Sequence, residues 1–119
     1  MGDKSMSLVI SEFDCPCCGE NRMNPRTFDR AVLGRDIAQV AWQINSGWRC
    51  IPHNEEVGGK DDSSHLNGTG LDIRSVTSRH RFKTVSALMD VGFTRIGIGR
   101  SFIHGDDDPN KDPAVMWLY

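Results

Sequence analysis

The sequence predicts an α+β fold: a single domain in which a short, mostly antiparallel sheet is backed by two helices. The chain has 119 residues, about one domain's worth. Two segments repeat apolar residues at the three- and four-residue steps of amphipathic helices, and five brief runs are rich in β-branched or aromatic residues. We expect residues 1–119 to form one domain, with a cysteine-containing N-terminal segment (1–23) and a core (24–119).

Asn24-Pro25 predicts the start of the first helix, because asparagine caps helix N-termini and proline suits the first helical position. The residues that then repeat with helical spacing are Phe28, Val32, Leu33, Ile37, Val40, Ala41 and Ile44. We expect a helix of about 20 residues that buries this face. Gly34 interrupts it at a cost of about 1 kcal/mol relative to alanine, and Gly47 is positioned to end it.

A second helix is expected to start near Ser78 and to stop at Gly92, with Phe82, Val85, Leu88 and Met89 buried. The expected strands are Trp48–Ile51, Gly70–Arg74, Arg95–Gly99, Ser101–His104 and Val115–Leu118. A polar, glycine-rich stretch separates the first two strands. Loops of this length usually carry function, so we expect the functional site beside it.

Composition and charge exclude several classes of protein. Of the residues, 38% are hydrophobic and 25% are charged, with no apolar run long enough for membrane insertion. Lys+Arg number 14 against 16 Asp+Glu, without a basic tail or stripe, so we expect no nucleic-acid partner. The first residues lack the pattern of a secretory signal, which predicts a chain that is cytoplasmic at synthesis.

The cysteines gather early in the chain, at Cys15, Cys17, Cys18 and Cys50. Four thiols are enough for a second, structural zinc ion, but the usual pair of CxxC knuckles is absent. A disulfide that ties the N-terminal segment to Cys50 and a set of buried free thiols are the other interpretations.

Two of the four histidines require no metal. His53 lies in the polar loop, where it assists substrate binding or caps a turn. His80 stands between Arg79 and Arg81 in the first turn of the second helix, and we expect it to be solvated.

The remaining histidines flank the pattern that carries chemistry. His65 precedes Asp72 by seven residues, with Gly68 and Gly70 between them to permit a tight turn. In a strand, Asp72 points away from the face that its two apolar neighbours bury. His104 lies on a later predicted strand. Two imidazoles and a carboxylate suit zinc and leave a fourth position for water, as in catalytic zinc sites.

Several ordered motifs resemble one known family. SSHLNGTGLDI resembles the SxHxxGxxxD signature of the zinc D-Ala-D-Ala carboxypeptidases, whose relatives include peptidoglycan-cleaving phage endopeptidases, lysostaphin-like enzymes and the hedgehog domain. SGWRCIPHN resembles the SGYRCxxHN segment of a small branch of this family, and GFTRIGIGRSFIHGDDDP with the closing WLY resembles that branch's GFxRIGIGxxFIHxDxD and WLY. The similarity spans roughly residues 46–119, with FDCPCCG a looser match.

The resemblance implies a hedgehog/D-Ala-D-Ala-peptidase-like fold, metal-assisted hydrolysis and specific residue roles. It makes His65, Asp72 and His104 the zinc ligands. Arg49 would hold a substrate carboxylate and Ser63 would contact substrate. From the residues alone, Arg49 is equally a surface ion-pair partner and Ser63 a loop-capping hydroxyl.

The general base departs from the pattern of better-known relatives, which have an acid or histidine two or three residues before the last ligand. Here those positions are Phe102 and Ser101. Asp106, two residues after His104, is the expected catalytic replacement. Its other interpretations are a partner that orients a ligand imidazole and a solvated carboxylate. Gly105 could bend the strand between them.

These residues lead to a first hypothesis and two alternatives. The first is a monomeric zinc peptidase, of carboxypeptidase or endopeptidase type, that hydrolyses peptidoglycan stem or cross-link peptides. Its small size would suit a phage-encoded enzyme that acts on the cell wall. The alternatives are a non-catalytic zinc-containing binding module on the same scaffold and a thiol-based redox protein built on the early cysteines.

Overall fold

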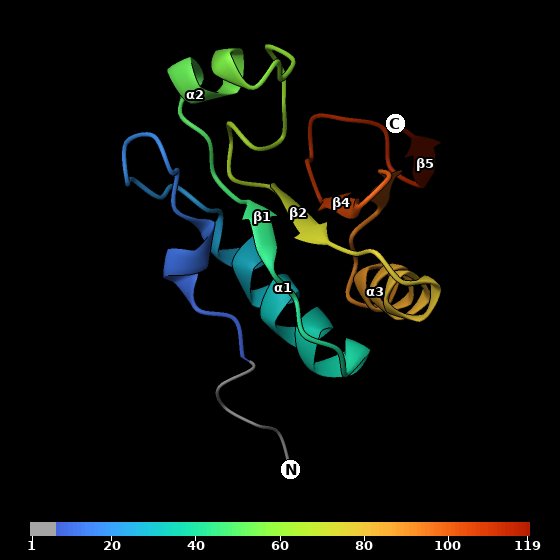
Figure 1. Cartoon of the computed structure of the whole chain (residues 1–119). Helices are drawn as coiled ribbons and strands as arrows, with labels where there is room; N and C mark the ends of the chain where they lie inside the picture. The colour runs from blue at the N-terminus through green and yellow to red at the C-terminus, as the bar shows by residue number, and fades with distance from the viewer. Residues whose placement is uncertain (1–6) are drawn as a thin grey trace.

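The computed structural model of this protein describes residues 7–119, so residues 1–6 of the predicted N-terminal segment lie outside the described residues. Its fold is α+β, as predicted (Figure 1). After a short 3-10 helix at Ile10–Phe13, the elements in chain order are α1 (Pro25–Ala38), β1 (Ile44–Ser46), α2 (Ile51–Glu56), β2 (Gly70–Arg74), α3 (Ser78–Asp90), β3 (Arg95–Ile98), β4 (Phe102–Asp106) and β5 (Val115–Leu118).

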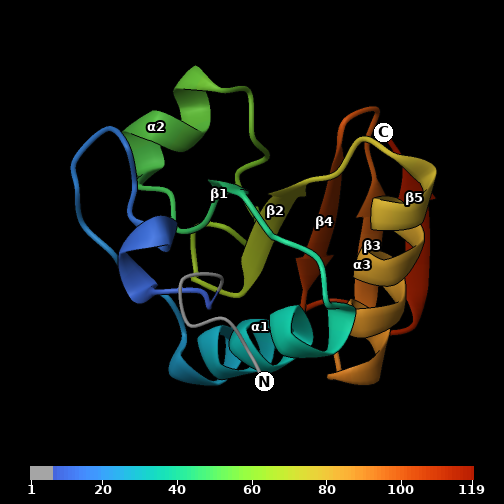
Figure 2. The same ribbon diagram turned by 60° about the horizontal axis from the view of Figure 1, so that its bottom comes forward.

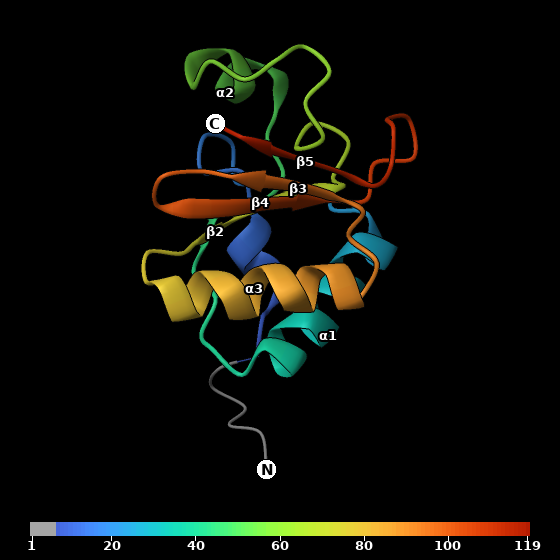
Figure 3. The ribbon, with the colours of Figure 1, turned by 90° about the vertical axis from the view of Figure 1, so that its right-hand side faces the viewer.

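The five strands form one mixed sheet in the order β1-β2-β4-β3-β5. Every neighbouring pair is antiparallel except β3 and β5, which confirms the mostly antiparallel expectation. Helices α1 and α3 cover one face, whereas α2 lies on the other side of the sheet (Figure 3). Figure 2 shows α2 well separated from both of them. Side chains of the central strands that point away from α1 and α3 therefore face α2 and its loops.

Helix α1 begins as predicted but ends nine residues before Gly47. The Asn24 side chain accepts a hydrogen bond from the N–H of Arg26, and Pro25 takes the first helical position. The helix stops at Ala38, and Gln39 adopts a left-handed conformation with φ of 56°. The expected helix of about 20 residues is thus wrong at its C-terminal end.

Packing of Trp42 explains the early end of α1. A Cβ atom on Gly34 would lie 3.0 Å from the Trp42 indole, so this glycine allows the chain to fold back and lay Trp42 on the helix. The buried face consists of small or polar residues: Thr27, Ala31, Gly34, Arg35 and Ala38. Leu33 and Ile37, which the periodicity predicted to be buried, are exposed.

Helix α3 confirms the second predicted helix, with Thr77 as its N-cap. Leu88 is buried, but Phe82 is 75% exposed and Met89 is also exposed, so their predicted burial is wrong. The predicted solvation of His80 is also wrong, since its ring nitrogens lie 2.7 Å from the Ser75 hydroxyl and 2.7 Å from the Ala41 carbonyl. The core contacts of α3 come instead from Thr84, Ala87 and Leu88.

The segment from 44 to 56 differs most from prediction. The strand expected at Trp48–Ile51 lies earlier, at Ile44–Ser46, and Ile51 begins the unpredicted helix α2. A Cβ on Gly47 would lie 2.5 Å from the Phe13 Cα. The chain therefore leaves the sheet at this residue, and the Trp48 N–H bonds to the Phe13 carbonyl instead of to a neighbouring strand.

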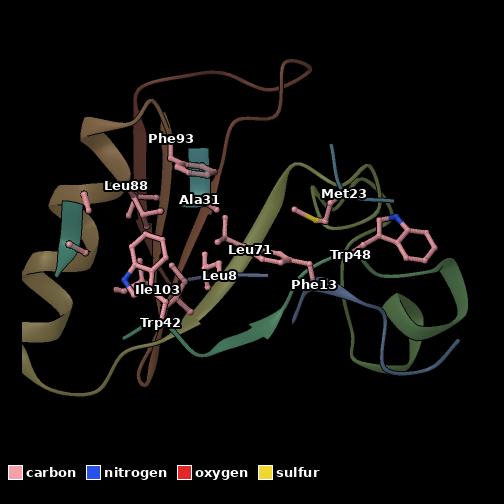
Figure 4. Close-up of a cluster of buried hydrophobic side chains, with 14 of the residues drawn as sticks. Leu8, Phe13, Met23, Ala31, Trp42, Trp48, Leu71, Leu88, Phe93 and Ile103 are labelled. Carbon is pink, nitrogen blue, oxygen red and sulfur yellow. The ribbon is translucent and has the colours of Figure 1, made fainter. Parts of the chain in front are cut away.

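The apolar core runs from the α1–α3 side of the sheet to the N-terminal segment (Figure 4). Leu71, Ile73 and Ile103 are fully buried strand residues, and Phe13 contributes from the N-terminal segment. Gly105 lies against Leu88 of α3. No helix within residues 7–119 is both long and apolar enough to cross a membrane.

Candidate metal centre

Strand alternation and register bring Asp72 and His104 together. Leu71 and Ile73 are in the core, so Asp72 of β2 faces the opposite side, as predicted. Strand β4 pairs with β2 in antiparallel register, and His104 is the cross-strand partner of Asp72. The Nδ1 atom of His104 lies 2.9 Å from Asp72 Oδ1. These two side chains are therefore set by the sheet itself.

His65 reaches the same point from the loop that follows α2. Gly68 turns this loop with φ of 78°, and a Cβ there would lie 2.2 Å from the Arg22 carbonyl, so only glycine fits. The His65 Nδ1–H donates to the Gly47 carbonyl at 2.7 Å, because a carbonyl only accepts. This bond leaves His65 Nε2 without a proton, 3.4 Å from Asp72 Oδ2.

The three side chains fit a metal ion. One ligand atom from each of His65, Asp72 and His104 lies within 4.8 Å of the others. Tetrahedral zinc with bonds of about 2.0–2.1 Å separates neighbouring ligand atoms by about 3.3 Å. Here His104 Nδ1 lies 2.9 Å from one oxygen of Asp72, Oδ1, and His65 Nε2 lies 3.4 Å from the other, Oδ2. Both nitrogens of His104 face carboxylates, and a neutral imidazole has a proton for only one of them. Either a second proton on His104 or a cation beside Nδ1 would resolve this conflict.

Asp106 lies behind His104. Its Oδ2 is 2.7 Å from His104 Nε2, and its Oδ1 is 2.9 Å from Arg95 Nε. The carboxylate is 1% exposed. Arg95 in turn lies over the Trp117 ring, 5.2 Å from its centroid. This series of contacts, from Trp117 through Arg95 and Asp106, holds the His104 imidazole in place by way of a buried ion pair.

Arg49 borders the centre rather than the outer surface. Its Nη2 lies 3.4 Å from Asp72 Oδ2, and its other nitrogens donate to the Ser46 hydroxyl and the Asn54 amide oxygen. Ser63 also lines the cavity, and its hydroxyl accepts a hydrogen bond from the His65 N–H at 3.2 Å. Both expected substrate-binding residues therefore lie beside the three candidate ligands.

The electrostatics of the centre favour the charged forms of its partners. Burial raises the pKa of Asp72, but the hydrogen bond with His104 and the nearby His65 ring outweigh it and hold the pKa well below the usual range of a carboxyl. Burial lowers the pKa of His104, but the carboxylates of Asp106 and Asp72 outweigh it and raise the pKa above the usual value. The result is a mutually stabilised cluster of opposite charges.

A cavity of about 570 Å³ opens over the centre, which is within the range of small-ligand sites. Its walls include the candidate ligands and four cationic side chains, Arg49, Lys60, Arg95 and Lys111. Against these cations, Asp72 and Asp106 are the only acidic side chains that line it among residues 7–119. The cavity is thus suited to an anionic group.

Comparison with family models identifies the chain. The model described as Peptidase M15 matches residues 24–106, which include the candidate ligands, Arg49, Ser63 and Asp106.

The chain belongs to the Peptidase M15 family. No curated protein matched it in the corresponding comparison. The family match confirms the resemblance noted in the motifs, and with it the hydrolase and metallopeptidase class. Members of this peptidase family depend on zinc, and the His-Asp-His cluster could hold such an ion.

Sequence reasoning missed Arg95 and Lys111 as cavity residues. Arg95 opens β3, whose antiparallel register pairs it with Asp106. The predicted strands Arg95–Gly99 and Ser101–His104 have only Arg100 between them, and this short connection was a signal for the hairpin and so for the pairing. Lys111 follows β4 in an irregular segment and has no local pattern that would have singled it out.

The four cysteines lie outside the cavity lining. The thiols of Cys15, Cys18 and Cys50 lie within 4.8 Å of one another, and all four cysteines are free. Although burial raises the pKa of the Cys15 thiol, hydrogen bonds from backbone N–H groups lower it to about 7. These three residues form a second group that could hold a metal.

Proposed function

We propose that this protein is a zinc-dependent peptidase that hydrolyses peptidoglycan stem or cross-link peptides, as a D-Ala-D-Ala carboxypeptidase or as an endopeptidase. The observation that carries the proposal is the convergence of His65, Asp72 and His104 on one cavity, with Arg49 at its wall. Membership of the Peptidase M15 family supports the same reaction class.

In this proposal His65, Asp72 and His104 hold the zinc ion. When bound, zinc supplies a Lewis acid that makes a water molecule more acidic and polarises the scissile carbonyl. The protein fixes which nitrogen each histidine offers. The Gly47 carbonyl binds the His65 Nδ1–H and leaves Nε2 as the ligand atom, while Asp106 accepts from His104 Nε2–H and leaves Nδ1.

Arg49 is proposed to bind a carboxylate of the substrate. A planar guanidinium forms paired hydrogen bonds with a carboxylate, which an ammonium group cannot match. Asn54 and Ser46 hold two of its nitrogens, so the guanidinium is fixed before substrate arrives. Lys60 and Lys111 add positive charge to the same cavity. Peptides with a free carboxylate, as in peptidoglycan stems, therefore suit the site, and Ser63 offers a hydroxyl beside it.

For Asp106 the contacts favour orientation of His104 over proton abstraction. Its two oxygens are engaged by His104 and Arg95, and the carboxylate is buried. A general base must reach the water that it deprotonates, and both oxygens here face protein partners instead. We therefore propose Asp106 as a positioning residue.

Hydrolysis assays test the function. Purified protein is incubated with peptidoglycan and with peptides that end in D-Ala-D-Ala, with and without a chelator, and products are identified by mass spectrometry. We expect cleavage that a chelator abolishes and added zinc restores. His104→Ala should lose it, while His80→Ala serves as the matched histidine control, since His80 lies outside the cavity. Absence of any chelator-sensitive product would refute the proposal.

The second candidate is a non-catalytic zinc-containing binding module on the same scaffold. The observation in its favour is that, in the part of the chain that the structure describes, no acidic side chain besides Asp72 and the buried Asp106 lines the cavity. Isothermal titration of the zinc-loaded protein with stem peptides separates the two functions. Tight binding without turnover of any peptide would favour the module, whereas turnover excludes it.

A further inference from the structure

Three thiols meet on the side of the molecule that carries α2, and none of them lines the cavity. The segment with Cys15 and Cys18 lies beside the start of α2, where Cys50 is the N-cap (Figure 1; Figure 2). Cys15 Sγ lies 3.6 Å from Cys50 Sγ. Tetrahedral zinc with bonds of about 2.3 Å to sulfur separates its thiolates by about 3.8 Å, whereas a disulfide brings two sulfurs to about 2.05 Å. The observed spacing matches a shared metal ion.

The first two cysteines belong to a metal-binding type of turn. Cys15 and Cys18 are separated by two residues, so one CxxC knuckle is present within the cysteine cluster. The Gly19 N–H donates to the Cys15 carbonyl at 2.8 Å, and Gly19 has a φ of 74°, which closes a tight turn.

The second half of the cluster repeats this spacing. Cys50 and His53 are also two residues apart, although His53 is not among the three residues whose ligand atoms lie within 4.8 Å of one another. The Nδ1 atom of His53 is buried and has no hydrogen-bond partner within residues 7–119, with Glu56 Oε1 at 3.8 Å. A buried ring nitrogen without a partner is costly unless it binds something. Cys17, which is exposed as Cys18 is, lies outside the group of three thiols.

We propose that Cys15, Cys18 and Cys50 hold a structural zinc ion, separate from the His65-Asp72-His104 centre, and that the His53 ring turns toward it to supply the fourth ligand. The ligand pattern is C-x2-C followed by C-x2-H, and all four protein ligands leave no open position for water. This proposal does not depend on peptidase activity. It replaces the disulfide and free-thiol interpretations of the cysteines with a single metal site.

The position of the site indicates what the ion would do. It would join the N-terminal segment to the first turn of α2, and Cys50 directly follows Arg49 in the chain. Helix α2 has six residues and makes few contacts with the sheet, so a cross-link at its start would hold the cavity wall that contains Arg49. The zinc is therefore expected to stabilise the fold and the substrate side of the cavity.

The test uses a variant that lacks the first centre, His65→Ala/His104→Ala, purified with a thiol-free reductant. We expect two zinc ions per chain in the natural protein and one in this variant, measured by elemental analysis. Cobalt substituted into the variant should show the thiolate-to-cobalt charge-transfer absorption of a cysteine-rich tetrahedral site. Adding Cys50→Ser to the variant should remove that absorption, while adding Cys17→Ser, the matched control, should preserve it.

If the Cys50→Ser variant does not fold, the His65→Ala/His104→Ala variant is titrated with a mercurial reagent instead. This variant keeps all four cysteines, so the test does not depend on a cysteine substitution. Zinc should be released as thiols react. A double variant without zinc and without the cobalt–thiolate absorption would overturn the proposal, as would a Cys15–Cys50 disulfide found by mass spectrometry. Adding His53→Ala should change the ligand-field bands of cobalt; unchanged bands would overturn the assignment of His53.

Discussion

Replacement of Asp106 by asparagine tests how His104 is held. Asparagine has almost the same volume and keeps one oxygen for the His104 Nε2–H, but it removes the negative charge. The lost interactions are the charge-assisted contact of 2.7 Å to His104 and the ion pair of 2.9 Å with Arg95. Because the carboxylate is buried, solvent does not compensate for either of them.

The size of the effect follows from the contact to His104. A hydrogen bond to a charged group contributes about 1.5–3 kcal/mol, against about 0.5–1.5 kcal/mol for a neutral pair. The difference of about 1.4 kcal/mol corresponds to a tenfold weaker affinity for zinc. Competition with a chelator of known affinity at pH 7 measures it. Partners behind metal ligands typically change affinity by about 10–100-fold, so this is a conservative expectation.

Asp107→Asn is the matched control. Asp107 is the next residue and is also buried, but its oxygens contact the Thr27 hydroxyl at 2.6 Å and Arg30 at 2.8 Å, and it does not line the cavity. Both variants should lose stability, and only Asp106→Asn should lose zinc affinity. The reasoning would be refuted if zinc affinity stayed unchanged while kcat fell and the acidic limb of the pH–rate profile disappeared, because Asp106 would then be the general base.

Three further changes test other parts of the structure. Arg49→Lys should raise KM about tenfold with kcat within about threefold, in steady-state assays with carboxylate-bearing peptides; a lower kcat at constant KM would contradict its binding role. Burial raises the pKa of Asp108, but hydrogen bonds, including one from the Ser64 hydroxyl, lower it below the ordinary value, so this carboxylate stabilises the fold above pH of about 4 and less as the pH falls. In urea unfolding, Asp108→Asn should therefore cost about 1 kcal/mol at pH 7 and less at pH 3, and an equal cost at both would count against it. Leu88→Ala should cost about 2–5 kcal/mol and Phe82→Ala less than about 0.5 kcal/mol, since only Leu88 is buried; similar costs would show that α3 presents another face.

Local signals predicted the elements that depend on local chemistry. The bounds of β2 and β5 agree with prediction, and so does the start of α1, since its N-cap bonds lie within four residues. The end of α1 could not be predicted, because Trp42 competes with helix continuation by packing on Gly34. The exposure of Phe82 also depends on tertiary packing. Periodicity marks a helical face, but the neighbouring elements decide which face is buried.

The candidate metal centre was also predictable only in part. The motif identified His65, Asp72 and His104 as a set, and strand alternation predicted the direction of Asp72. Neither the motif nor strand alternation predicted the residues that orient these three ligands. The Gly47 carbonyl behind His65 and the Arg95–Asp106 pair behind His104 come from segments far apart in the chain.

By itself, the sequence determined an α+β chain with a metal-binding motif, since caps, alternation and motif spacing all act over a few residues. Only the tertiary structure decided the partners of those residues. Register set Asp72 against His104 and Arg95 against Asp106. The fold also brought Cys50 to Cys15, 35 positions earlier, where the sequence had left a disulfide, a metal and free thiols as alternatives. The physical reason is that such contacts depend on packing between distant segments, which no local pattern records.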